Sequence, residues 1–181
     1  LHFAKALLYP VAAAPFVRLF GMNGLLLMHV VLLGAMAWFG YLFLSAQMSN
    51  LAAVVFVTAF LGASALPVYA VFLTPELLMV ALVFAAYVLW AYKLAATAPG
   101  RWGGVWTDVV AAILIGLVTY AKPTNGMLIA PLVVYAWVRR QWVRGLLVAS
   151  VFAIALAAGF GLTFAVAGEV NYQGGDRKTF Y

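Results

Sequence analysis

A short polar turn in an otherwise apolar sequence holds the residues best suited to bind an anionic ligand. Lys122-Pro123-Thr124-Asn125-Gly126 combines an ammonium group with hydroxyl, amide and backbone N–H donors. Cations and N–H donors of this kind bind phosphate oxygens. Lys122 also ends an apolar run, where a cation is favoured by the helix dipole and a long side chain can extend to water. A purely structural role for Lys122 therefore stays open.

Glu76 is the candidate acid. Thr74-Pro75-Glu76 has the composition of a helix start, because threonine is a common N-cap, proline suits the first turn, and an acid is favoured at the positive end of the helix dipole. The sequence admits two roles for Glu76: an acid that stabilises a helix end, and an acid or metal ligand that lines a cleft.

Lys5 and Arg18 are the charged residues of the N-terminal segment. Pro10 and Pro15 lie between them and exclude a straight membrane-spanning helix, so an amphipathic segment in the membrane interface is expected instead. Both cations could there contact a specific anionic ligand or ordinary lipid headgroups. His29 is isolated within the next apolar run, and we expect a hydrogen-bonded packing residue rather than a ligand.

The composition indicates a membrane protein. Apolar residues make up 68% of the 181 residues and charged residues 8%, whereas soluble domains have about 45–50% and about 25%. A soluble chain of this length could not bury so much apolar surface, which excludes a soluble enzyme, a disordered chain, a coiled coil and a nucleic-acid-binding domain. The 10 Lys and Arg against 4 Asp and Glu are spread over short loops and indicate membrane topology rather than a nucleic-acid partner. The absence of cysteine excludes disulfides and cysteine-ligated metals.

The apolar runs predict an all-α fold, a polytopic transmembrane helix bundle with about six spanning helices in one domain. The predicted spans cover residues 25–45, 51–72, 76–96, 106–121, 124–138 and 142–167, between an interfacial segment at 1–24 and an extracytoplasmic tail at 168–181. The fourth and fifth spans are short. One long kinked helix in their place would hold Lys122 near the middle of the membrane, which is costly, so two helices are favoured.

Charges and tryptophans predict the orientation. One face carries most of the cations of the short loops: Lys93, Arg101, Arg139, Arg140 and Arg144. The same face carries most of the tryptophans: Trp90, Trp102, Trp106, Trp137 and Trp142. The positive-inside rule places this face in the cytoplasm and the face with Glu76 and Lys122 outside it, in a bacterial-type plasma (inner) membrane. We interpret the arginines as topology signals and Asp108 as a helix-start acid.

The chain carries three groups of short motifs: Tyr9-Pro10 with Pro15-Phe16-Val17-Arg18-Leu19-Phe20-Gly21 and Asn23-Gly24, then Pro75-Glu76, and then Ile115-Gly116-Leu117 with Lys122-Pro123. Together they resemble motifs of GT-C-fold glycosyltransferases of the protein O-mannosyltransferase-like and aminoarabinose-transferase-like families. The first group resembles the stretch after the first extracytoplasmic loop of that fold, the second its acidic turn between two later helices, and the third its Gly-Leu…Thr-Lys motif. Since the chain begins with Leu1 and stops within a polar stretch, we expect an internal fragment of a longer protein.

The resemblance implies transfer of a sugar from a polyprenyl-phosphate donor to an extracytoplasmic lipid, glycan or protein. The catalytic carboxylate is expected before Leu1, so no catalytic residue is assigned in this chain. Lys122 would bind the donor phosphate with Asn125, Arg18 and Lys5, and Glu76 would be the acid of the cleft. No cofactor is assigned, and a divalent metal stays open.

Two other classes of function fit the same composition. A transporter or permease subunit would share the helix bundle, but it would tend to have internal repeats or charges near the midplane of the membrane. This sequence has no evident repeat, and its charges fall at helix ends. A non-catalytic membrane scaffold is the third alternative.

Overall fold

The structure is a computed structural model that describes residues 6–168, and it is built from helices and short connections throughout that range. The α-helices are α1 Leu8–Phe20, α2 Asn23–Ser45, α3 Asn50–Ala63, α4 Leu66–Val71, α5 Pro75–Ala95, α6 Trp106–Ala121, α7 Ala130–Val138 and α8 Trp142–Ala167. Two 3₁₀ helices, η1 Gly100–Gly103 and η2 Pro123–Ile129, lie before and after α6. The predicted all-α fold is therefore confirmed for the described residues.

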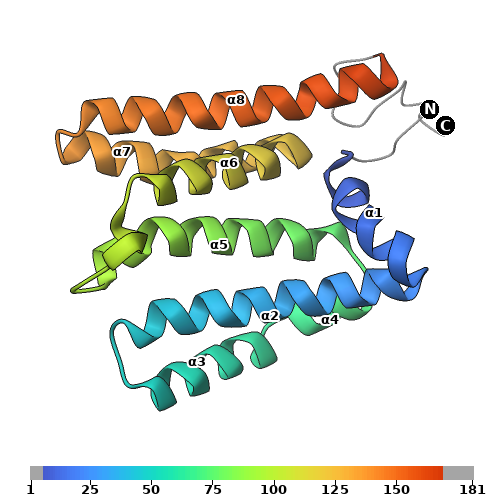
Figure 1. Ribbon diagram of the computed structural model, residues 1–181, viewed down its shortest axis with the longest axis horizontal. Helices are drawn as coiled ribbons and strands as arrows, with labels where there is room; N and C mark the ends of the chain where they lie inside the picture. Colours follow the sequence, from blue (N-terminus) through green and yellow to red (C-terminus); the bar gives the residue numbers. More distant parts are fainter. Residues whose placement is uncertain (1–5, 169–181) are drawn as a thin grey trace.

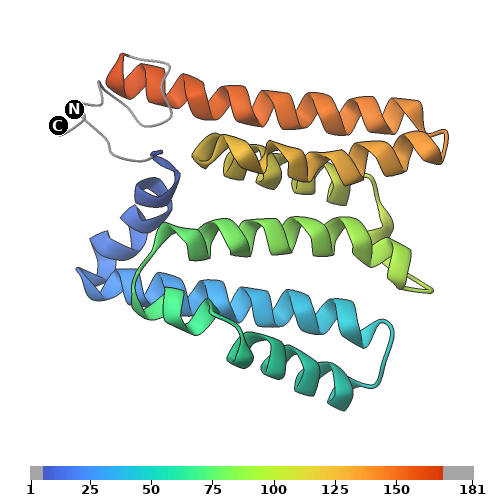
Figure 2. The same ribbon diagram turned by 180° about the vertical axis from the view of Figure 1, so that it is seen from behind.

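The long helices lie side by side and form a layered bundle. Helix α5 packs between α2 and α6, α6 packs against α8, and α3 covers the outer side of α2 (Figure 1). Helix α1 crosses one end of this layer, and the view from behind shows the same arrangement (Figure 2). The bundle thus has two distinct ends, and the polar residues gather at them.

Among the described residues, three helices are long and apolar enough to cross a membrane. They are α2 with 23 residues, α5 with 21 and the segment Trp142–Val166 of α8 with 25. A helix of 20 residues spans about 30 Å, the thickness of the hydrocarbon layer. Many large apolar side chains point outward, including Leu51, Val55 and Val143 at 76%, 57% and 83% exposure. Such a surface matches lipid better than water.

The predicted span 51–72 is interrupted. Helix α3 ends at Ala63 and α4 begins at Leu66. The hydroxyl of Ser64 donates to the Leu61 carbonyl oxygen and accepts from the Leu66 N–H. Pro67 then lies in the first turn of α4, where its missing N–H does no harm. A serine that bonds to nearby backbone groups, followed by proline, offers the chain an alternative to a continuous helix.

The chain reverses at Lys122, as the turn sequence predicts. Helix α6 ends at Ala121, and Lys122 has an extended backbone with φ −150° and ψ 102°. The returning segment packs η2 against α6 and α7 against α8. The predicted span 124–138 is therefore η2 followed by α7, rather than one regular helix.

Small residues allow the close packing of the inner helices. Ala86, Ala111, Ala112 and Ile115 form part of one buried cluster between α5, α6, α7 and α8. A Cβ on Gly116 would lie 2.9 Å from the Phe152 carbonyl oxygen of α8, so only glycine permits this approach of α6 to α8. Packing through small residues is typical of helices in membranes.

Candidate functional site

Three of the predicted site residues line one pocket. Glu76, Lys122 and Asn125 surround a cavity of about 440 Å³ between α5, α6 and η2. Its remaining lining residues are apolar apart from one phenol: Met79, Val80, Val83, Phe84, Tyr87, Val118 and Leu128. We call this cavity the Lys122 pocket. It places a cation, a carboxylate and an amide around a single apolar-walled space.

The antiparallel packing of α5 and α6 brings these residues together. Glu76 lies in the first turn of α5, and Lys122 follows the last residue of α6, so the start of one helix meets the end of the other. Asn125 is held by its backbone N–H, which donates to the Lys122 carbonyl oxygen over 2.9 Å. Its side-chain amide lies 3.5 Å from the Val118 carbonyl oxygen near the end of α6.

Tyr87 fixes the inner wall of the Lys122 pocket. Its hydroxyl donates to the Leu128 carbonyl oxygen of η2 over 2.8 Å, which joins the middle of α5 to the returning segment. The wall of the pocket is therefore held by a hydrogen bond between α5 and η2 as well as by apolar contacts.

A second, apolar pocket adjoins the first. A cavity of about 420 Å³ lies between α2, α3 and α5, and it shares Phe84 and Tyr87 with the Lys122 pocket. It is lined by Met36, Gly40, Phe43, Leu44, Met48, Phe56, Val57, Phe60, Leu61, Phe84, Tyr87, Val88 and Ala91. The Lys122 pocket, whose apolar wall carries three polar side chains, thus borders a wholly apolar pocket along α5.

Arg18, another predicted phosphate ligand, does not line this pocket. It is exposed in the last turn of α1, and its assistance to Lys122 stays a prediction. Thr124 is also exposed and outside the lining. Lys5 and the tail after Gly168 lie outside the described residues.

Thr74 occupies the N-cap position of α5, as predicted, but its side chain caps no backbone N–H. Its hydroxyl oxygen is buried without a hydrogen-bond partner among the described residues. The residue before it, Leu73, has a φ of 53°, which is unusual for a residue with a side chain. The connection between α4 and α5, which leads into Glu76, is thus held by contacts other than a Thr74 cap.

Tyr9 and His29 provide those contacts. The Tyr9 hydroxyl donates to the Leu73 carbonyl oxygen over 3.3 Å and lies 2.9 Å from His29 Nε2. His29 Nδ1 lies 3.1 Å from the Ala70 carbonyl oxygen of α4. Burial raises the pKa of the Tyr9 phenol above its usual value of 10.0, so it remains a donor at neutral pH. His29 is buried and hydrogen-bonded, as the packing interpretation predicts.

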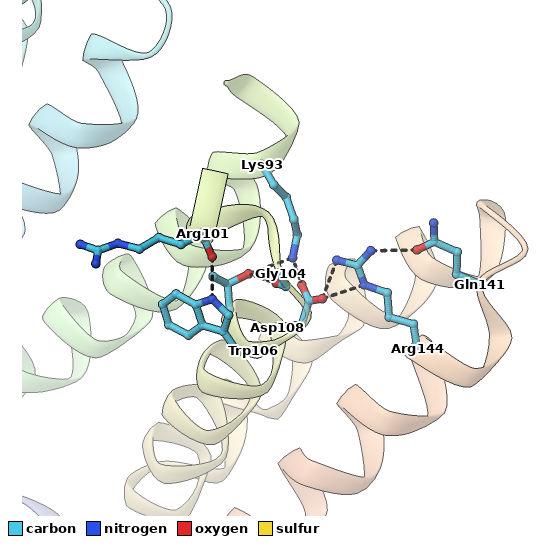
Figure 3. A network of polar contacts seen from close by, with 8 residues as sticks. Lys93, Arg101, Gly104, Trp106, Asp108, Gln141 and Arg144 are labelled. Atoms are coloured by element: carbon cyan, nitrogen blue, oxygen red, sulfur yellow. Dashed lines mark hydrogen bonds and ion pairs between the residues drawn. The ribbon is translucent and has the colours of Figure 1, made fainter. Parts of the chain in front are cut away.

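A charged cluster lies at the opposite end of α5 and α6 (Figure 3). The carboxylate of Asp108, with a side chain only 2% exposed, pairs with Lys93 of α5 and accepts from Arg144 Nε of α8 over 2.7 Å. Lys93 also donates to the Thr107 hydroxyl over 3.0 Å, and Arg144 Nη1 donates to Gln141 Oε1 over 3.0 Å. Three helices are joined through one carboxylate.

This cluster corrects two sequence interpretations. Asp108 is more than a helix-start acid, because its carboxylate pairs with two cations. Arg144 is more than a topology signal, because its guanidinium is bonded to the same carboxylate as Lys93. The signal in the sequence was a single acid at an end of the bundle that otherwise carries cations.

The described residues suggest no metal site. Within residues 6–168 there is no group of three or more His, Cys, Asp or Glu side chains that could hold a metal ion.

No protein-family model, no curated protein and no solved structure matches this chain. The functional argument below accordingly uses the residues and the geometry described above.

Proposed function

We propose that this chain carries the donor-binding part of a membrane glycosyltransferase that uses a polyprenyl-phosphate sugar. The observation that supports the proposal best is the pairing of two cavities: the Lys122 pocket, whose apolar wall also carries Lys122, Asn125 and Glu76, shares Phe84 and Tyr87 with a wholly apolar pocket. A lipid phosphate has the same two parts, an anionic group and an apolar chain. No observation on this chain favours transport or a scaffold role to the same degree.

In this proposal Lys122 binds the phosphate of the donor, and Asn125 adds an amide donor beside it. A carboxylate outside this chain deprotonates the acceptor hydroxyl, whose oxygen attacks the anomeric carbon of the sugar. The bond between that carbon and the phosphate oxygen breaks, and the leaving polyprenyl phosphate keeps the electron pair. The ammonium of Lys122 stabilises the negative charge that grows on the phosphate oxygens. The apolar chamber holds the isoprenoid units next to the phosphate.

The proposal includes a membrane topology with six spans. Helices α2, α5, α6 and α8 each form one span. The pair α3–α4 forms a fifth span, and the pair η2–α7 forms a sixth. Helix α1 lies in the interface. The Lys122 pocket faces the extracytoplasmic side of a bacterial-type plasma membrane, and the Asp108 cluster faces the cytoplasm, because the exposed arginines and tryptophans gather at that end.

The orientation is tested by labelling single cysteines in intact cells. We expect Gln141→Cys to react only with a membrane-permeant thiol reagent, and Thr124→Cys to react with an impermeant one. Both residues are exposed in turns, so accessibility within the protein does not limit the reaction. The opposite pattern of labelling would invert the orientation and remove the extracytoplasmic site.

The role of Glu76 is tested by Glu76→Gln in the full-length protein, which keeps the shape of the side chain and removes its charge. If Glu76 acts in the pocket, sugar transfer should fall by about tenfold or more, in the range seen for groups placed around a reacting centre. If Glu76 only stabilises a helix end, Glu76→Gln should lower the folding stability by about 0.3–1 kcal/mol and leave the activity unchanged. Transfer from a polyprenyl-phosphate sugar in membranes, at matched expression, distinguishes the two. Full activity of a folded Glu76→Gln protein would remove Glu76 from the site.

A further inference from the structure

The end of the bundle that carries the Asp108 cluster has more positive charge than its own acids can neutralise. Within residues 6–168 the acids are Asp108 and Glu76, and Glu76 lies at the far end of α5. Asp108 is shared by Lys93 and Arg144, which leaves the cluster with one net positive charge. Lys93 is only 8% exposed, so water screens this charge weakly.

Three further cations lie in the loops at the same end of the bundle as the cluster. Arg139 and Arg140 are exposed in the turn between α7 and α8, and Arg101 is exposed in η1. Figure 3 shows the guanidinium of Arg101 pointing away from Asp108. These three arginines therefore add positive charge to the surface and do not share the carboxylate of Asp108.

Arg144 connects the buried cluster to this surface. A guanidinium has five N–H donors. Nε and Nη2 of Arg144 bond to Asp108, and Nη1 bonds to Gln141, so three of the five N–H groups are used. The side chain is 26% exposed, so Arg144 is the member of the Asp108 cluster that reaches the surface.

Exposed tryptophans indicate that this end of the bundle lies at the depth of the lipid headgroups. Trp106, Trp137 and Trp142 are 44%, 41% and 58% exposed at this end, and the rings of Trp137 and Trp142 lie 6.1 Å apart. Exposed tryptophans are enriched at the depth of lipid headgroups, where the ring is partly apolar and its N–H can reach water or polar groups. An anion that approaches at this depth is the phosphate of a lipid.

We propose that Arg144, Arg139 and Arg140 form a binding site for the phosphate of an anionic phospholipid, in the membrane leaflet opposite the Lys122 pocket. The site is separate from the proposed donor site and does not depend on it. The lipid phosphate supplies the second negative charge that Lys93 and Arg144 lack beside Asp108, and it would fix the α7–α8 turn against the start of α6.

The test compares lipid binding by the full-length protein with either phosphatidylglycerol or phosphatidylcholine, measured by native mass spectrometry and by the thermal unfolding midpoint. We expect retained phosphatidylglycerol and a higher midpoint in its presence. Arg144→Gln leaves Asp108 paired one-to-one with Lys93, so the fold should persist while affinity for phosphatidylglycerol drops about fivefold. Arg139→Gln combined with Arg140→Gln, which leaves the Asp108 cluster untouched, should lower it at least as much.

Arg18→Gln is the matched control, because it removes one exposed positive charge from the other end of the bundle. If Arg18→Gln lowers phosphatidylglycerol binding as much as Arg144→Gln does, the effect is one of net charge and the proposed site is wrong. Inorganic phosphate is the second control. If it raises the unfolding midpoint as much as phosphatidylglycerol does, the site binds a free anion and the lipid assignment is wrong. Equal retention of the two lipids by the wild-type protein would also overturn the proposal.

Discussion

Replacing Lys122 by methionine should lower sugar transfer by the full-length protein about tenfold or more, without loss of the helix bundle. Lys122 is exposed at the end of α6 and lines the pocket, and methionine keeps the apolar part of its side chain. The ammonium gains most when charge builds on the leaving phosphate, so turnover should fall and not only affinity for the donor. Lys122→Arg keeps the charge with a different shape and should restore part of the activity.

The measurement is transfer from a polyprenyl-phosphate sugar in membranes, at matched expression. Thr124→Ala is a suitable control, since Thr124 is exposed in the same turn but does not line the pocket. Equal turnover of Lys122→Met and wild type would make Lys122 a helix-end residue that extends to headgroups. An inactive wild type with every donor tried would favour the transporter alternative.

Asp108→Ala should have the largest effect on stability, about 3–5 kcal/mol. Removing the carboxylate leaves Lys93 and Arg144 as two neighbouring cations, one of them buried, with no counter-charge. Unfolding of the purified protein in detergent measures the loss, and loss of the fold in cells would appear as low expression.

Two variants separate the charge from the packing at this position. Arg144→Gln leaves the pair between Asp108 and Lys93 and should cost clearly less than Asp108→Ala. Replacing all three residues with apolar ones, Lys93→Met with Asp108→Leu and Arg144→Met, should recover much of the stability, because no unpaired charge then remains. An Asp108→Ala protein as stable as the wild type would show that these ion pairs do not hold the three helices together.

Much of the fold could be predicted from apolar runs and turn residues. The predicted bounds 106–121 match α6, because Lys122-Pro123 is a strong local stop. The break at Ser64 was missed, since a serine within an apolar run is common and its bonds to Leu61 and Leu66 depend on local geometry. The irregular η2 was also missed, because apolar composition alone does not distinguish a 3₁₀ helix from an α-helix.

The grouping of Glu76 and Lys122 could be anticipated, because consecutive antiparallel helices bring the start of one near the end of the other. Asp108 could not be assigned a partner in this way. A helix dipole alone explains an acid in a first turn, and Arg144 reaches it only through the packing of α6 against α8. The place of Arg18 outside the pocket lining could not be predicted for a related reason, since the direction of α1 across the bundle end is set by its contacts with α2 and Leu73.

Photo-crosslinking with a polyprenyl phosphate that carries a photoreactive group on its first isoprenoid units tests the central claim most directly. The two-chamber account predicts labelled residues on the shared and apolar walls, namely Phe84, Tyr87 and the buried Val57. It also predicts competition by unlabelled polyprenyl phosphate but not by polyprenol, and weaker labelling of Lys122→Met. Labelling confined to outward-facing residues such as Val143 and Leu146 of α8, or equal competition by the uncharged alcohol, would contradict the account.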